Sequence, residues 1–378
     1  MGRVHVLLLL VVLGLVASCG GDDPTCVVTF NSLGGSSVAP LTVSTGGLLA
    51  MPNPAPTNGA FAFGGWYRDA ACLTPWMFAT DRVSADMTLY AKWWVAVPGP
   101  VLLPEMVSVP AGANISIGWA GLSEPVHTVA SLSAFRIGKY EVTYALWTNV
   151  VVWALANGYT FTAGSGVMGD GSGDTELHPV TTINHRDALA WCNALSQRSG
   201  LGPVYFTTAG QTNVYTNATD TTSALVATGT AGANDCVRTS ANGYRLPTEA
   251  QWEYASRRRA DGTLTDGDKP AGYNGTFTNY ADAATALAEW GPYGWFTGNS
   301  SGTHIVGTTT YANGTGLYDM SGNVWEFCWD WNASYTTASP FTDTDTLGAP
   351  SGTGRVLRGG SWDDGASWQR IAARYSSP

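Results

Sequence analysis

Two short segments near the N-terminus combine apolar and polar residues in the manner of β-strands. Residues Cys26-Val27-Val28-Thr29-Phe30 and Thr88–Trp93 show the near-alternation that is typical of a half-buried strand. The Gly34-Gly35 pair between them is a turn signal. The pattern therefore predicts a small β-rich unit over residues 25–95.

Helical patterns occur only further along the chain. The apolar residues of Asp187–Ser196 recur at helical spacing, and Asn184 precedes them as a predicted N-cap. Glu249–Arg257 consists of strong helix formers with an acidic first turn, and Thr248 is its predicted N-cap. We expect one helix in each segment.

A proline-rich linker separates the β-rich unit from a second domain. Pro98-Gly99-Pro100 lies within residues 96–104, and proline restricts both its own backbone and that of the residue before it. Strand patterns at Met106–Val109 and at the start of Phe135–Thr143 predict that the second domain spans residues 105–378.

The N-terminus has the pattern of an export signal. Arg3 precedes an apolar run from Val6 to Val16, which is too short to span a bilayer comfortably. Val16-Ala17-Ser18-Cys19 resembles a bacterial lipobox, so residues 1–18 are a predicted signal peptide and Cys19 the predicted lipidation site. Residues 19–24 form a short tether. The alternative is an ordinary cleaved signal with a coincidental cysteine.

Composition excludes some classes of function. Only 12% of the residues are charged and the formal net charge is −10, whereas the chain has 46 Gly, 16 Trp and 16 Tyr. Without a Lys/Arg cluster it does not fit a nucleic-acid-binding protein, which needs a basic surface. The sequence instead predicts a loop-rich domain with aromatic anchors.

The cysteines of an exported protein are candidates for disulfides. Cys26 and Cys72 both lie in the β-rich unit, and we predict that they pair. The other three, Cys192, Cys236 and Cys328, are an odd number, so their pairing stays open.

Four collinear motifs resemble the formylglycine-generating, or sulfatase-modifying, enzyme family. They are FRIGKYEVT at 135–143, NGYRLPTEAQWEYASR at 242–257, GLYDMSGNVWEFCWDW at 316–331, and RVLRGGSW with RIAAR within 355–374. The resemblance implies an α+β fold, C-type-lectin-like, with much irregular structure. It also implies a further loop and a Gly-Phe-Arg strand, so the C-terminal end of the domain is expected to be missing from residues 105–378.

The N-terminal unit resembles a different family. Its segments VTFNSLGG, FGGWY and MTLYAKW are similar to the Listeria–Bacteroides repeat, a β-grasp-like module of bacterial surface proteins. The resemblance implies that this module serves as a stalk or spacer.

The third motif of the larger domain contains a candidate calcium site. Asp319 and Glu326 bracket the main-chain carbonyls of Gly322 and Val324, and calcium prefers such oxygen ligands. The matching positions bind calcium in the family. The alternative is that Asp319 caps the turn and Glu326 pairs with an arginine.

Copper is not expected in this chain. Catalytic family members bind copper through two cysteines shortly after the GGS turn, because thiolates are soft ligands that select Cu(I). Here Gly359-Gly360-Ser361 is followed by no cysteine, since the last one in the chain is Cys328. No other catalytic motif replaces them. The sequence therefore predicts no catalytic residues.

The segment after the GGS turn is a candidate binding face. Aromatic side chains are enriched at binding hot spots, and the face is predicted to comprise Trp362, Asp363, Asp364, Ala366, Ser367, Trp368 and Tyr375. The segment also resembles the variable regions of retroelement-diversified surface lipoproteins. The alternative for the tryptophans is ordinary core packing.

These patterns together predict a lipid-anchored protein of the cell envelope, at the outer membrane or cell surface. It would recognise an unidentified protein or glycan, contact the membrane through its lipid, and be stabilised by calcium. The alternatives are a sulfatase-modifying oxidoreductase and a structural component of an envelope complex.

Overall fold

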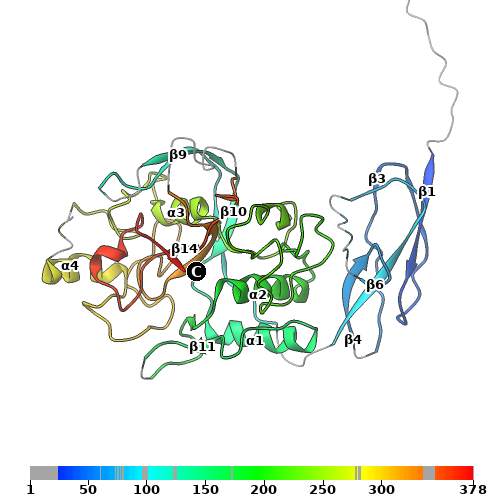
Figure 1. The fold of residues 1–378 in the computed structure, drawn as a ribbon, viewed down its shortest axis with the longest axis horizontal. Coiled ribbons are helices and arrows are strands. Elements are labelled where there is room, and N and C mark those ends of the chain that lie inside the picture. Colours follow the sequence, from blue (N-terminus) through cyan, green and yellow to red (C-terminus); the bar gives the residue numbers. More distant parts are fainter. Residues whose placement is uncertain are drawn as a thin grey trace, which may run out of the picture.

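The computed structural model describes residues 24–59, 61–72, 74, 76, 78, 81–95, 101–121, 126–171, 173–276, 279, 282–334 and 345–377 (Figure 1). The predicted signal peptide and Cys19 lie outside the described residues, as does most of the tether. In the described part of the chain, no helix combines the length and apolar character needed to cross a membrane.

The N-terminal module is built from strands. They are β1 (Thr25–Asn31), β2 (Leu41–Ser44), β3 (Gly47–Leu48), β4 (Phe61–Tyr67), β5 (Arg82–Val83) and β6 (Met87–Val95). The main sheet has the order β2-β1-β6-β4, with β1 and β6 parallel, and β3 pairs with β5. Its core contains Val28, Trp66 and Leu89, all buried.

The larger domain mixes short strands with helices. Its strands are β7 (Met106–Val109), β8 (Gly112–Ile117), β9 (His127–Leu132), β10 (Phe135–Gly138), β11 (Val167–Met168), β12 (Val180–Thr181), β13 (Glu326–Trp331), β14 (Arg355–Arg358) and β15 (Arg374–Ser377). Its helices are α1 (Tyr144–Ala156), α2 (His185–Arg198), α3 (Glu249–Arg257) and α4 (Ala283–Trp290), with short 3-10 turns η1 (Asn234–Cys236), η2 (Gly291–Tyr293) and η4 (Ala366–Gln369).

The sheets of this domain are small, and long irregular segments connect them. β13, β14 and β15 form a three-stranded antiparallel sheet, while β7 pairs with β10, β8 with β9 and β11 with β12. The mixture of helix, strand and irregular structure confirms the predicted α+β class.

Local capping explains where the two predicted helices begin. The Asn184 side chain accepts from Asp187 N at 3.0 Å, and the Thr248 hydroxyl accepts from Gln251 N at 3.2 Å. Both form capping boxes, because the side chain of the third helical residue, Asp187 or Gln251, accepts a hydrogen bond from the backbone N–H of the N-cap residue. α3 has the predicted bounds, whereas α2 is longer than predicted by two residues at each end.

The two largest hydrophobic clusters of this domain lie around its helices. One lies around α1 and α2, where Trp147 stacks on Trp191 with ring centroids 5.7 Å apart. The other surrounds α3 and contains the fully buried Trp252 together with Val356 of β14. The second cluster supports the segments that carry the candidate site.

The predicted Cys26–Cys72 disulfide is wrong: both thiols are buried and free. Extending the β1–β6 register places Cys26 opposite residue 85, whereas the Cys72 thiol donates to the carbonyl of Ala91, six positions further along β6. At about 3.3 Å per residue the two cysteines lie roughly 20 Å apart, well beyond the ~7 Å between α-carbons that a disulfide spans. Cys192, Cys236 and Cys328 are buried and free as well.

Candidate functional site

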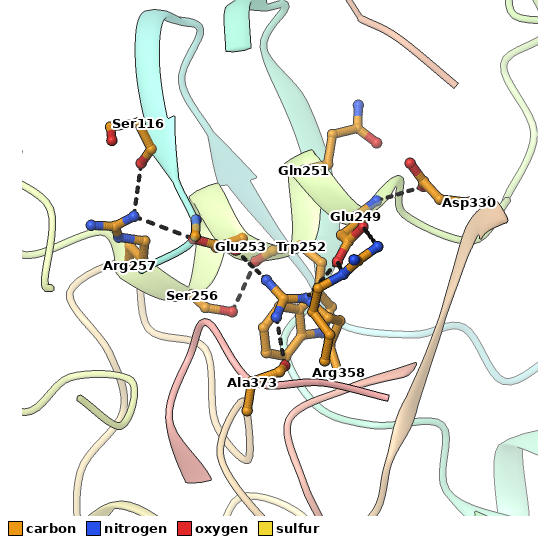
Figure 2. A network of polar contacts seen from close by, with 12 residues as sticks. Ser116, Glu249, Gln251, Trp252, Glu253, Ser256, Arg257, Asp330, Arg358 and Ala373 are labelled. Carbon is orange, nitrogen blue, oxygen red and sulfur yellow. Dashed lines mark hydrogen bonds and ion pairs between the residues drawn. The ribbon is translucent and has the colours of Figure 1, made fainter. Parts of the chain in front are cut away.

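A buried network of charged side chains holds the segments that lead to the site. Glu249 and Glu253 of α3 face Arg358 of β14, which is completely buried (Figure 2). Arg374 of β15 also binds Glu249, through Nε–Oε1 and Nη2–Oε2 contacts of 2.6 and 2.9 Å. Arg257 approaches Glu253 at 3.2 Å. Acidic and basic side chains therefore compensate one another across α3, β14 and β15.

Two glycine turns meet where β14 ends. Gly359 and Gly360 both have positive φ, and Gly322 N donates to Gly359 O at 2.8 Å. Gly322 has φ +86°, and a β-carbon there would lie 2.1 Å from the Trp295 carbonyl oxygen. Only glycine fits this close approach. The GGS turn and the loop that carries Asp319 and Glu326 are thus packed against each other.

Three acidic side chains surround this loop: Asp319 is buried, whereas Glu141 and Glu326 are half-buried. Asp319 is only 2% exposed, and its Oδ2 accepts from Gly307 N. Glu326 accepts from the Trp252 indole at 3.1 Å. Glu141, which precedes α1, accepts from the Asn323 amide at 2.7 Å and from Val324 N at 3.2 Å. Glu141 was not among the residues that the sequence singled out.

The surroundings of these acids disfavour their charged forms. Burial raises the pKa of Glu326 to about 8, with a further rise from the charge of Asp319, and burial raises the pKa of Asp319 to about 6. The pKa of Glu141 lies well above its ordinary value, chiefly through burial and then through Asp319 and Glu326. Among the described residues, no Lys or Arg forms an ion pair with Asp319 or Glu326. The predicted alternative of an arginine partner for Glu326 therefore finds no support.

These residues fit a bound cation. Asp319 Oδ1 and Glu326 Oε1 are buried and accept no hydrogen bond, and a divalent ion would satisfy such atoms. The carbonyl oxygens of Met320 and Val324 both face Gly359, 3.7 and 3.9 Å from where its β-carbon would lie. Nowhere in the described chain do three or more His, Cys, Asp or Glu side chains gather as a metal site, so main-chain carbonyls would supply much of the coordination.

An aromatic cluster lies beside this loop. Trp368 of η4, Tyr375 of β15 and Trp325 of the loop pack together, with ring centroids 5.6 Å apart for Trp325–Trp368 and 5.7 Å for Trp325–Tyr375. Trp368 is 36% exposed and Tyr375 is 55% exposed. We call Trp325, Trp368 and Tyr375 the aromatic face. It is a packed and partly exposed surface formed by three separate segments.

The other predicted binding residues separate into different environments. Trp362 is half-buried and lines, with Asp363 and Trp325, a cavity of about 1470 Å³. Asp363 is exposed, and Ser367 is half-buried. Asp364 instead holds the turn, because its Oδ2 accepts from Ser361 N at 3.0 Å and from the Ser361 hydroxyl at 2.6 Å.

The prediction that Ala366 belongs to the binding face is wrong. Its side chain is buried against Trp290 and Phe296 in a small hydrophobic cluster. The 3-10 turn η4 directs Ala366 inward and leaves Trp368 at the surface. A run of residues in sequence therefore does not form one continuous face.

Two residues of the candidate site, Trp325 and Glu141, carried only weak signals in the sequence. Trp325 lies between Val324 and Glu326 in the loop already selected for calcium, and a large aromatic residue beside a ligand was the available sign. Glu141 is the acidic residue within the motif Phe135–Thr143. Its partner Asn323 lies 182 residues away, so nothing local connected the two.

Comparison with known proteins agrees with this architecture. The model of the sulfatase-modifying factor enzyme 1-like domain matches residues 95–378, which is most of the chain. The chain belongs to this family. The Listeria–Bacteroides repeat model matches residues 27–92, so the resemblances of the two domains to these two families are confirmed.

Individual relatives show how far the likeness extends. The chaperone protein LppX of Paenibacillus barcinonensis is 31% identical over 245 residues, covering 61% of this chain and 70% of that protein. The formylglycine-generating enzyme of Thermomonospora curvata is 34% identical, over 35% of this chain and 44% of the enzyme. This chain therefore spans less than half of that enzyme.

A solved structure of similar fold is that of Treponema denticola variable protein 1. It superimposes with a TM-score of 0.55 at 34% sequence identity, covering 72% of this chain and 88% of that protein. The likeness extends over most of both chains, which is consistent with the fold described above.

Proposed function

We propose that this protein is a surface-anchored lipoprotein whose sulfatase-modifying-factor domain recognises a protein or glycan ligand without catalysing a reaction. The observation that carries the proposal is the aromatic face of Trp325, Trp368 and Tyr375, partly exposed beside the GGS turn. Aromatic side chains bury large areas on binding and are enriched at hot spots. Asp363 and the cavity lined by Trp362 adjoin Trp325 and extend the surface that is available to a ligand.

The chemistry of the same segment supports recognition rather than oxidation. Residues 361–378 contain no cysteine, so the paired thiolates expected for a copper oxidase of this family cannot form there. Cys328 is completely buried in β13, and burial raises the pKa of its thiol well above the ordinary value. A buried, protonated thiol is a poor nucleophile and a poor metal ligand.

A copper titration tests this absence of catalysis. We expect no stoichiometric tight binding of Cu(I) and no oxygen-dependent oxidation of a cysteine-containing peptide, because no pair of accessible thiolates is present. The measurement combines competition with a Cu(I) chelator and mass spectrometry of the peptide. Tight 1:1 binding together with peptide oxidation would instead establish the sulfatase-modifying oxidoreductase function that the enzyme relatives suggest.

Calcium would have a structural role in this proposal. Glu326 and Asp319 would supply carboxylates, and the carbonyls of Val324, Gly322 and Met320 are candidates for the remaining ligands. Trp325 lies within the same loop. An ion bound there would order the loop that places Trp325 against Trp368 and Tyr375.

Truncation of Trp368 tests the aromatic face. Trp368→Ala is expected to weaken ligand binding by about 2 kcal/mol, the usual scale of a hot-spot residue, and to leave the domain folded because the side chain is partly exposed. Hits from a glycan array and from a displayed peptide library serve as probes, with affinities measured by calorimetry.

Leu155→Ala is the control for Trp368→Ala. Leu155 is an exposed apolar residue of α1 outside the aromatic face, so its truncation should not change binding. If Trp368→Ala unfolds the domain and neither screen yields a ligand, Trp368 is a core residue and this face is not the binding site.

Further relatives support an envelope location. A putative Gly-rich membrane protein of Evansella cellulosilytica is 44% identical over 70 residues, which is 18% of this chain and 8% of that protein. The relative LppX also covers most of this chain. We propose that Cys19 anchors the protein through lipid at the outer membrane or cell surface.

Replacing Cys19 tests the anchor. Cys19→Ala is expected to release the protein into the soluble fraction or to leave it unprocessed, because the lipid attaches to the cysteine thiol. The measurement follows labelled palmitate and membrane fractionation, with Cys26→Ala as a control that keeps the lipobox. Labelled fatty acid on Cys19→Ala would exclude the lipobox interpretation.

A further inference from the structure

The N-terminal module has a sheet with two different faces. Alternation along β6 directs Leu89, Ala91 and Trp93 toward the module core. The alternate residues Tyr90, Lys92 and Trp94 face the other way, and so does Tyr67, which follows the core residue Trp66 in β4. In an isolated module this outer face would be exposed to solvent.

Two aromatic side chains of this outer face are nevertheless buried. Tyr67 is 2% exposed and Trp94 is 5% exposed. The Trp94 indole lies over Gly64, where a β-carbon would come within 2.2 Å of its nitrogen. Lys92 Nζ lies 4.4 Å from the Trp94 ring centroid and 5.5 Å from that of Tyr67. Burial of this kind requires a covering surface.

The covering surface comes from the larger domain. Trp94 meets Trp153 of α1 edge to face, with ring centroids 5.1 Å apart, and belongs to the same core cluster as α1 and α2. Gln197 of α2 donates to the Tyr67 hydroxyl at 3.4 Å and accepts from Tyr159 at 2.6 Å. One amide thus connects a tyrosine of each domain.

We propose that the module is a rigid mount, docked through Tyr67, Lys92 and Trp94 onto Trp153, Tyr159 and Gln197, so that both domains move as one body. Figure 1 shows the module at one end of the molecule and α4 with the red C-terminal segment toward the other. A docked module would hold the aromatic face in a fixed orientation relative to the module. That the mount serves to orient the aromatic face rests on the proposed recognition function. The docking of the module does not depend on that function.

Distances between spin labels test the docking without any ligand. Thr42→Cys on β2 and Thr212→Cys in the larger domain place one label on each body, because both threonines are exposed. The five described cysteines are buried and would not react. In the lipoprotein held in detergent micelles, pulsed dipolar spectroscopy is expected to give one narrow distance distribution.

Variants on both sides of the contact make the test specific. Trp94→Ala and Trp153→Ala should each abolish the narrow distribution, since each removes half of the aromatic contact. Tyr90→Ala is the matched control: Tyr90 is on the same strand and the same face as Trp94 and makes none of the contacts above. It should keep the narrow distribution. Circular dichroism checks folding, and Gln197→Leu replaces any variant that fails to fold.

Two results would overturn the proposal. A broad distribution in the otherwise unaltered protein would show that the module is a flexible spacer, and an unchanged narrow distribution in the folded contact variants would show that these residues do not hold the domains together. A narrow distribution that the contact variants abolish, in a protein for which no ligand is found, would support the mount and count against recognition alone.

Discussion

Arg358→Met is expected to lower the free energy of unfolding of the larger domain by about 3–5 kcal/mol, because it removes one partner from a buried ion network. Arg358 is completely buried and contacts Glu249 and Glu253 of α3 together with the Ala373 carbonyl. Without this arginine, less positive charge compensates the buried carboxylates of Glu249 and Glu253. Urea unfolding followed by tryptophan fluorescence measures the loss.

The network variant has a control on another strand. Arg136 of β10 is exposed, so Arg136→Met should change the unfolding free energy by no more than about 0.5 kcal/mol. A loss below about 1 kcal/mol for Arg358→Met would contradict the idea that this arginine compensates buried acids. It would also count against the inference that Arg358 holds the GGS turn against α3.

Calcium should stabilise the larger domain by about 2.7 kcal/mol when its concentration is a hundredfold above the dissociation constant, because the ion binds the folded state only. A chelator is therefore expected to lower the melting temperature, and Glu326→Gln should remove most of that response by deleting a ligand charge. Differential scanning calorimetry measures both effects. Glu176→Gln, at an exposed acid, is the control and should keep the full response.

Without calcium, stability should fall as the pH rises. The folded pKa of Glu326 is about 8 against an ordinary 4.5, so between these values the folded state holds a proton that the unfolded state has released. This contribution is complete below about pH 4.5 and is lost as the pH rises through about 8. Calcium should stabilise more at pH 8 than at pH 5, since it replaces the proton. Identical melting with and without calcium at pH 8 would leave Asp319 and Glu326 as residues of the fold alone.

The short-range features of this protein could be predicted from the sequence. Asn184 and Thr248 cap helices whose partner atoms lie three residues away, so the local sequence contains the whole interaction. The strand patterns at Met106–Val109 and Phe135–Gly138 were also readable, because alternation is a local property. The family motifs assigned the loop around Gly322 and the GGS turn to the same domain.

Contacts between distant segments could not be predicted in this way. Cys26 and Cys72 belong to the same small module, yet the strand register separates them by six positions along β6. Ala366 and Trp368 are two residues apart, and a 3-10 turn sends one inward and leaves the other at the surface. Proximity along the chain is a poor guide wherever the backbone is irregular.

The sequence by itself determined the family, the fold class, the N-caps of α2 and α3 and the absence of cysteine between the GGS turn and residue 378, because these depend on residue identity and local spacing. Only the tertiary structure decided which side chains meet. It brought Glu141 to Asn323 and Trp325 to Tyr375, and it covered the outer face of the module with α1 and α2. The physical reason is that burial and electrostatic compensation act between surfaces whose residues lie far apart along the chain, and their energies appear only once the domains have packed.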